Sequence, residues 1–148
     1  MGTHFKGLKK EICALNSFIK LMRAADSLNS KVNNELAKVG LSESQFNVLD
    51  ALYHLGPLTQ KDLGKKLLRS GGNITMVIDN LEKRRYVKRK RWKDDRRFYI
   101  VHITEKGEEK IKNVLPGQVK LITEQMNGLN KNEQLELQKL CKKVGLKD

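Results

Sequence analysis

The sequence predicts a mainly α-helical protein that carries one small β-hairpin. Three observations favour this fold class. Apolar residues recur every three or four positions through most of the 148 residues, as they do on one face of a helix. Residues that cap helices stand in front of several of these segments. Between residues 87 and 103 the pattern changes to β-branched and aromatic residues, which are typical of strands.

The first helix is expected over residues 6–38, ahead of Gly40. Its apolar positions keep helical spacing from Leu8 to Met22, and a second stripe with a shifted phase continues to Leu36. With a rise of ~1.5 Å per residue, such a helix spans roughly 50 Å. A single small domain cannot cover a helix of that length, so part of the stripe is expected to contact another chain.

Three further helices are expected in the middle of the chain. The motif SESQ is a capping box that opens a helix over residues 42–55, and the Gly-Pro pair at 56–57 ends it. The motif TQKD opens a helix over residues 59–67 in the same way. A helix over residues 71–85 follows the turn LRSGG, in which Ser70 is a further N-cap.

The hairpin is expected to have strands over residues 87–91 and 98–103, joined by a loop over residues 92–97. Two short helices with a tight turn between them, followed by a hairpin, describe a winged helix-turn-helix. In that fold the helix over residues 71–85 is the recognition helix, which enters the major groove of DNA. The loop over residues 92–97 is then the tip of the wing.

The last third of the chain is again helical. Thr104 is the expected N-cap of a helix whose apolar stripe runs from Ile111 to Leu129. The Pro-Gly pair at 116–117 is expected to kink or break that helix. The motif NKNE, which starts at Asn130, is a capping box for the final helix.

Positive charge is concentrated in one short segment. The formal net charge is +13, and residues 83–97 contain ten Lys or Arg with only two acids. Charge focused in this way indicates a polyanionic partner, and double-stranded DNA suits the predicted fold. A basic face kept only for solubility is the alternative. Tyr86, Val87 and Trp92 interrupt the run, which argues against that alternative.

The start of the predicted recognition helix is small and uncharged, so its backbone can approach base edges closely. Asn73 can pair with adenine, Thr75 with a base or a phosphate, and Met76 with a thymine methyl group. The free N–H groups of the first turn also favour a phosphate. Alternatively, the Gly-Gly pair only relaxes a tight turn. The predicted DNA-facing residues are Ser70, Gly71, Gly72, Asn73, Thr75 and Met76, with Thr59, Gln60 and Lys61 from the preceding helix.

Two adjacent acids, Asp94 and Asp95, stand inside the basic loop. A carboxylate at Asp95 can hold the guanidinium of Arg97 in one bidentate geometry. An arginine oriented in this way can enter the narrow minor groove of DNA. Asp94 is expected to begin the turn by bonding to its own backbone. Other wing residues are expected to contact phosphates and to give salt-sensitive affinity, namely Arg89, Arg91, Lys93 and Arg96.

The segments SGGNITMVIDNLEKRRYV and DDRRFYIVHITEKG resemble the MarR (multiple antibiotic resistance regulator) family of bacterial repressors. The wing pattern of that family, D-x-R and then a strand that ends in L/I-T-x-x-G, is matched by Asp95, Arg97, Ile103, Thr104 and Gly107. The resemblance covers nearly the whole chain. It implies a homodimer whose two wings bind a pseudo-palindromic operator with half-sites ~10 bp apart.

The resemblance also implies how the chain is divided. Residues 1–38 form an N-terminal dimerisation helix, residues 39–104 the winged helix-turn-helix lobe, and residues 105–148 the C-terminal dimerisation helices. Release of DNA is expected from a small phenolic or aromatic ligand, or from oxidation of a thiol. A ligand cleft is expected at Phe18, Met22, Phe46 and Tyr53, with ordinary core residues as the alternative. Cys13 is the candidate thiol, and a packed, inert cysteine is the alternative.

Other functional classes have less support. The sequence contains no phosphate loop and no HExxH motif, and its three histidines are scattered. We therefore expect neither an enzyme nor a bound cofactor or metal. Cys13 and Cys141 lack metal-ligand spacing and favour a reducing compartment. No segment approaches the ~18 apolar residues of a membrane span, so a cytoplasmic protein is expected. A non-specific DNA-packaging or RNA-binding protein is the main alternative, since basic patches alone do not give specificity.

Overall fold

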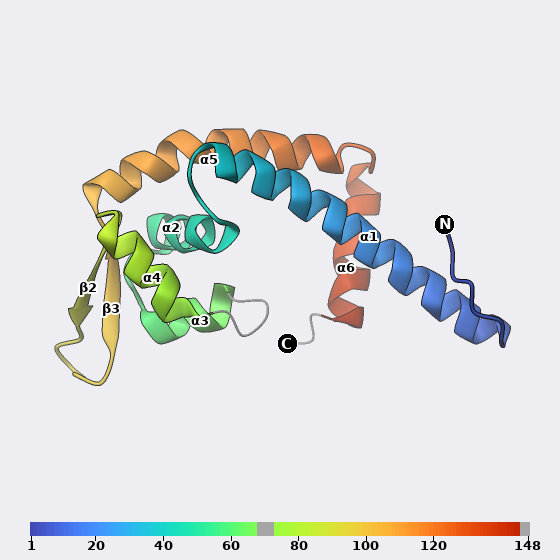
Figure 1. Cartoon of the computed structure of the whole chain (residues 1–148), viewed down its shortest axis with the longest axis horizontal. Coiled ribbons are helices and arrows are strands. Elements are labelled where there is room, and N and C mark those ends of the chain that lie inside the picture. Colours follow the sequence, from blue (N-terminus) through green and yellow to red (C-terminus); the bar gives the residue numbers. More distant parts are fainter. Residues whose placement is uncertain (68–72, 146–148) are drawn as a thin grey trace.

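The computed structural model describes residues 1–67 and 73–145. It is a mostly helical fold with one small antiparallel sheet, which confirms the predicted fold class (Figure 1). A lobe of short helices and the sheet lies at one end of the molecule, and two long helices extend from it towards the other end. Within the described residues, no helix has the length and apolar character needed to cross a membrane.

Helix α1 covers Lys9–Lys38, so it begins at Lys9 rather than at residue 6. Its first turn is held by Glu11, whose Oε2 accepts the backbone N–H of Leu8 at 2.9 Å. Leu36 is the one residue of this helix that is buried in the single chain. The amino-terminal part of α1 extends away from the lobe (Figure 1), which leaves its apolar stripe exposed.

The predicted capping signals fix the next two helices. Helix α2 covers Glu43–Leu55, and the capping box at Ser42 is confirmed. It ends at Gly56, whose φ of 81° favours glycine. Helix α3 covers Gln60–Leu67. The hydroxyl of Thr59 accepts a backbone N–H of its first turn at 3.1 Å.

Helix α4, the predicted recognition helix, covers Ile74–Lys83. Asn73 is its N-cap, because the side-chain oxygen of Asn73 accepts the backbone N–H of Met76 at 3.3 Å. The described part of the helix therefore begins at Ile74, and the expected start at Gly71 lies outside the described residues. An asparagine at the N-cap satisfies a first-turn N–H that would otherwise have no partner, which fixes the start of the helix. The expected N-cap Ser70 lies outside the described residues.

The two wing strands form, and the second begins one residue later than predicted. Strand β2 covers Val87–Arg91 and pairs antiparallel with β3, which covers Tyr99–Ile103. A third strand, β1 at Leu58–Thr59, pairs with the other side of β3 and gives the order β1-β3-β2. The sequence did not predict β1, because two residues are too short to show alternation. This strand attaches the start of α3 to the wing and leaves β2 at the edge of the sheet.

The C-terminal helices carry the chain past the lobe. Helix α5 covers Glu105–Met126 without interruption, so of the kink or break expected at Pro116 the break does not occur. Proline inside a helix costs about 3 kcal/mol. Ile111 and Gln118, on either side of it, are buried, and this packing holds the helix together. Helix α6 covers Lys131–Val144 and begins at the predicted capping box.

The hydrophobic core lies inside the lobe, where α2, α3, α4, the sheet and the first half of α5 meet. Gly107 lets α5 pack closely against the segment between α4 and β2, since a Cβ at Gly107 would lie 2.1 Å from the carbonyl oxygen of Tyr86. The fully buried side chains are Leu36, Leu49, Leu52, Leu63, Ile78, Leu81, Ile111, Val48, Val87 and Val101. This core fixes α4 relative to the wing, which sets the geometry of the predicted DNA-facing surface.

Candidate nucleic-acid interface

At the wing tip, residues 92–97, the predicted ion pair between Asp95 and Arg97 is confirmed. The Nε of Arg97 donates to Oδ1 of Asp95 at 3.0 Å, and its Nη2 donates to Oδ2 at 2.7 Å. The side chain of Arg97 is 83% exposed, whereas that of Asp95 is 25% exposed. Hydrogen bonds from the side chain and then the backbone of Arg97 lower the pKa of Asp95. The loop therefore presents an exposed cation in a fixed orientation.

The turn at the wing tip is closed by Asp95 and not by Asp94, which corrects the expected role of Asp94. The Oδ1 of Asp95 accepts the backbone N–H of Arg97 at 3.1 Å, and its carbonyl accepts that of Phe98 at 3.1 Å. Arg91 supports the same loop, because its Nη1 donates to the carbonyl of Arg96 at 2.6 Å. Part of Arg91 is therefore used to brace the loop, while Lys93 and Arg96 are exposed.

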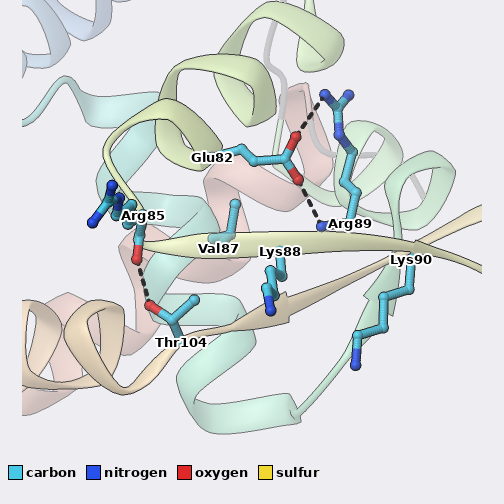
Figure 2. A pocket seen from close by; sticks show the side chains of 7 residues that line it. All are labelled: Glu82, Arg85, Val87, Lys88, Arg89, Lys90 and Thr104. Atoms are coloured by element: carbon cyan, nitrogen blue, oxygen red, sulfur yellow. Dashed lines mark hydrogen bonds and ion pairs between the residues drawn. The ribbon is translucent and has the colours of Figure 1, made fainter.

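Arg89 is a correction to the predicted set of phosphate-binding residues. Its side chain is only 20% exposed, and its Nη2 forms ion pairs with Asp79 and Glu82 of α4. Glu82 also accepts the backbone N–H of Arg89 at 2.9 Å (Figure 2). Burial lowers the pKa of Arg89, but the hydrogen bonds of the two carboxylates outweigh burial and raise it. Arg89 therefore joins β2 to α4 and is not free for a phosphate.

A hollow of about 500 Å³ lies beside this ion pair, at the free edge of β2. Figure 2 shows Lys88 and Lys90 on the side of the strand opposite to Glu82. The lining residues are Glu82, Arg85, Val87, Lys88, Arg89, Lys90 and Thr104. The hydroxyl of Thr104 donates to the carbonyl of Arg85 at 2.6 Å, which joins the start of α5 to the wing. Most of the charged side chains around this hollow are basic.

The start of α4 presents exposed polar side chains without any acid in its first turn. Asn73 and Thr75 are exposed, and Met76 is 66% exposed. The cap uses one of the two acceptor positions of the Asn73 oxygen, so one position remains for a base. Ser70, Gly71 and Gly72, which belong to the predicted set, lie outside the described residues.

Gln60 of α3 joins α4 to the wing. Its Nε2 donates to the hydroxyl of Thr75 at 2.9 Å, and its Oε1 accepts a bond from Arg89 at 3.4 Å. Lys61 lies with its ammonium 5.8 Å from the ring centre of Phe98 at the wing tip. A niche of about 230 Å³ between these elements is lined by Gln60, Lys61, Ile74, Arg97, Phe98 and Tyr99. The wing tip and the start of α4 therefore border one concave surface.

Comparison with known proteins identifies this arrangement. A model of the MarR family matches residues 41–98. The HTH-type transcriptional regulator MhqR of Bacillus subtilis (strain 168) is 36% identical over 133 residues, which cover 90% of this chain and 92% of that protein. The chain belongs to the MarR family. It is therefore a DNA-binding transcriptional regulator and not an enzyme.

Solved structures share the fold of this MarR-family chain. A mutant of MarR from E. coli, complexed with operator DNA, has a TM-score of 0.76 and 27% identity over 95% of this chain and 99% of that one. A structure of Bordetella bronchiseptica BpsR has a TM-score of 0.76 and 23% identity over 86% of this chain and 97% of that one. Its subject is the regulation of BpsR DNA binding by 6-hydroxynicotinic acid.

Two of the four residues predicted to line a ligand cleft lie on α2 and two lie on α1 of this MarR-family chain. Phe46 belongs to the core, and Tyr53 packs against the core. Phe18 is 61% exposed and Met22 is 43% exposed on α1. The alternative, an ordinary core residue, is therefore correct for Phe46. A different hollow, of about 410 Å³, lies between α1 and the junction of α5 and α6, lined by Ala24, Ser27, Leu28, Gln125, Met126, Gly128, Leu129 and Leu137.

Cys13 is exposed in the single chain. Asp79 and Glu82 are structural residues of the interface that the sequence did not identify. Their signal was present, because two acids three positions apart on the recognition helix stand just before a strongly basic strand. The pairing of Arg89 with these two acids depends on how strand β2 packs against α4. The spacing of apolar residues in the sequence does not predict that packing.

Proposed function

We propose that this MarR-family regulator is a homodimeric repressor that binds a pseudo-palindromic operator. The observation that carries the proposal is that two kinds of surface lie on different parts of the chain. The lobe presents the oriented Arg97 and the exposed start of α4. The helices outside the lobe present apolar side chains that the single chain does not cover.

The dimer is supported by the helices α1, α5 and α6. Helix α6 has apolar positions at helical spacing, yet none of its residues is buried in the single chain. Such a helix needs a partner surface to be stable in water. The exposed apolar residues of the three helices include Leu15, Phe18, Leu21, Met22, Val119, Ile122, Leu135, Leu140 and Val144. A second copy of the chain with the same stripes supplies that partner surface.

The operator is read in two grooves under this proposal. The start of α4 enters the major groove, and Arg97 at the wing tip enters the adjacent minor groove. Lys93 and Arg96 contact phosphates and supply salt-sensitive affinity. Because a dimer has two-fold symmetry, its operator has two half-sites, ~10 bp apart, in inverted orientation. The proposed site of action is the cytoplasm, where a bacterial transcriptional regulator meets its DNA.

DNA is released, in this proposal, by a small aromatic ligand or by thiol oxidation. The apolar hollow of about 410 Å³ beside α1 is large enough for a single aromatic ring and its substituents. It lies between elements that also carry the proposed dimer contacts, so a ligand there can change the spacing of the two lobes. For oxidation, the exposed thiol of Cys13 on α1 is accessible to an oxidant.

Dimerisation and operator choice are tested together. We expect a dimer in sedimentation experiments at micromolar concentration, and an inverted repeat in sequences selected from a random duplex pool. Leu140→Glu places a charge on the apolar stripe of α6 and is expected to give monomers with an intact lobe. Gln138→Glu adds the same charge on an exposed position of the same helix and is the matched control. A monomeric wild-type protein, or a selected sequence without a repeat, contradicts the proposal.

The two routes of release are separated by one pair of measurements on the selected operator. Hydrogen peroxide is expected to weaken binding by the wild type but not by Cys13→Ser if oxidation is the signal. A panel of hydroxylated benzoic acids is expected to weaken binding by both proteins equally if the ligand is the signal. Binding that is unchanged in every sample contradicts both routes and leaves the repressor without either form of release.

A further inference from the structure

The recognition helix is connected to the wing by a chain of hydrogen bonds whose direction is fixed. Asp79 and Glu82 hold Arg89, and Arg89 donates to the side-chain oxygen of Gln60 at 3.4 Å. A guanidinium has only donors, so the oxygen of Gln60 must face Arg89. The amide nitrogen of Gln60 must then face the other way, towards Thr75. The orientation of this amide is thus set by Arg89 and is not arbitrary.

The hydroxyl of Thr75 receives a defined role from this arrangement. Gln60 donates to it at 2.9 Å, so Thr75 is the acceptor in that bond. The hydroxyl proton is left to point elsewhere, and accepting a bond makes a hydroxyl a better donor. Thr75 is exposed in the first turn of α4, the part of a recognition helix that contacts base edges. Thr75 therefore keeps one proton to donate, and one acceptor position remains on its oxygen.

The direction of the Asn73 side-chain amide is also restricted by a hydrogen bond within the protein. Its Oδ1 accepts the backbone N–H of Met76 at 3.3 Å and caps the helix. Its amino group is left to face outward, and an amino group only donates. The usual pairing of asparagine with adenine needs the side-chain oxygen to accept from the adenine amino group. The cap occupies one of the two acceptor positions of this oxygen, so it competes with that pair and favours the amino donor of Asn73.

We propose that the first turn of α4 selects guanine, because Thr75 and Asn73 both present donors there. The major-groove edge of guanine has two acceptors, N7 and O6, and no donor. Cytosine presents an amino donor, which would oppose the donors of the helix. Gln60 is the positioning residue that sets the direction of the Thr75 hydroxyl. This inference rests on the proposed function, since it concerns the same operator.

The test is selection from a random duplex pool with the wild type and variants of Gln60 and Thr75. The wild type is expected to select guanine at one position of each half-site. Thr75→Val, which removes the hydroxyl but keeps the shape, is expected to lose preference at that position, and Thr75→Ser to keep it. Gln60→Glu retains the bond to Arg89 but can only accept from Thr75. It is expected to shift the preference from guanine towards adenine or cytosine.

Charge and folding effects are separated from base choice by a matched control. Asn113→Asp adds one negative charge on an exposed position of α5, away from the surface formed by the wing tip and the start of α4. It is expected to select the same sequence as the wild type. If Gln60→Glu and Thr75→Val also select the wild-type sequence, or lose affinity equally for every sequence, the inference is overturned. If the wild type itself selects no sequence, the proposed function fails instead.

A chemical substitution in the DNA tests the contact itself. Replacing the selected guanine by 7-deazaguanine removes the N7 acceptor without changing base pairing. Loss of one hydrogen bond is expected to weaken wild-type binding about threefold to tenfold. The same replacement is expected to leave the affinity of Thr75→Val for this duplex nearly unchanged. Equal losses for the two proteins would mean that Thr75 does not donate to N7, and an unchanged preference of Thr75→Val for guanine would then remove Thr75 from base recognition.

Discussion

At the wing tip, Arg97 is paired with Asp95 of its own loop. Arg89 in strand β2 is instead paired with Asp79 and Glu82 of helix α4. The two arginines have the same donors and the same kind of partner. They differ in surroundings, because the side chain of Arg97 is 83% exposed and that of Arg89 is 20% exposed. The first pair therefore holds a solvent-exposed cation in one orientation, and the second connects two elements of the fold.

The difference between the two arginines shows that the basic residues of one segment have different roles. Each role depends on whether the side chain stays at the surface or pairs with another part of the fold. A local carboxylate leaves an arginine at the surface and limits its rotation. Carboxylates on a packed neighbouring helix remove the arginine from the surface altogether. Counting the cations of the wing therefore overstates how many can reach DNA. Variants of the Arg97 pair and of the Arg89 pair test these two roles separately. Their expected effects range from large losses of DNA binding to a small shift in the pKa of Asp95.

Removing the exposed cation should affect binding and leave folding unchanged. Arg97→Ala is expected to weaken operator binding roughly tenfold to a hundredfold, since it deletes the minor-groove contact. Its urea unfolding curve is expected to overlay that of the wild type, because exposed ion pairs contribute little to stability. Binding is measured by fluorescence anisotropy on a labelled duplex. Unchanged binding would show that the wing tip does not reach DNA.

Removing the half-buried cation should affect folding first. Arg89→Ala leaves Asp79 and Glu82 without their partner and is expected to lower the free energy of unfolding by about 1–2 kcal/mol. This value allows for screening, because both carboxylates are partly exposed to water. Arg96→Ala, at an exposed wing position, is the control and should change stability by less than about 0.5 kcal/mol. Equal unfolding midpoints for the two variants would contradict the connecting role of Arg89.

Removing the orienting acid tests whether charge or geometry matters more at the wing tip. Asp95→Ala raises the net positive charge, yet it is expected to weaken binding about threefold to tenfold because Arg97 loses its fixed orientation. In the Arg97→Ala background the same change should no longer weaken binding. Tighter binding by Asp95→Ala alone would mean that the carboxylate only repels DNA.

The remaining wing cations should act through phosphates. Lys93→Ala is expected to reduce the slope of log affinity against log salt by about 0.9, the value for one lost phosphate contact. Its effect should be equal for operator and random duplexes, in contrast to variants of Thr75. Affinities measured over a series of salt concentrations provide the slope. A change in sequence preference would assign Lys93 to base recognition instead.

The pKa of Asp95 gives the smallest and most local test. Hydrogen bonds from Arg97 lower it below the ordinary value of 3.8. Because the folded-state pKa is lowered, the pair contributes at all pH values above the ordinary one. It is lost only as the pH falls through the lowered pKa. A carbon-detected NMR titration should therefore show a midpoint below 3.8 in the wild type and a return towards 3.8 in Arg97→Ala.

Most of the secondary structure was accessible from the sequence because its signals are local. The capping boxes at Ser42 and Asn130 and the N-cap Thr104 each involve residues three positions apart, and the structure confirms all three. The strand over residues 87–91 was also predicted correctly. Errors arose where the result depends on packing, as at Pro116, where buried neighbours hold the helix together. The two-residue strand β1 exists only because β3 lies beside it.

By itself, the sequence determined the helices and their caps, the concentration of charge in the wing, and the pairing of Asp95 with Arg97. Each of these depends on residues within a few positions, so chain geometry alone brings them together. Only the tertiary structure decided that Arg89 is taken up by α4 and that Gln60 sets the direction of the Thr75 hydroxyl. Those contacts join separate elements, and burial of the shared core is what places such elements side by side.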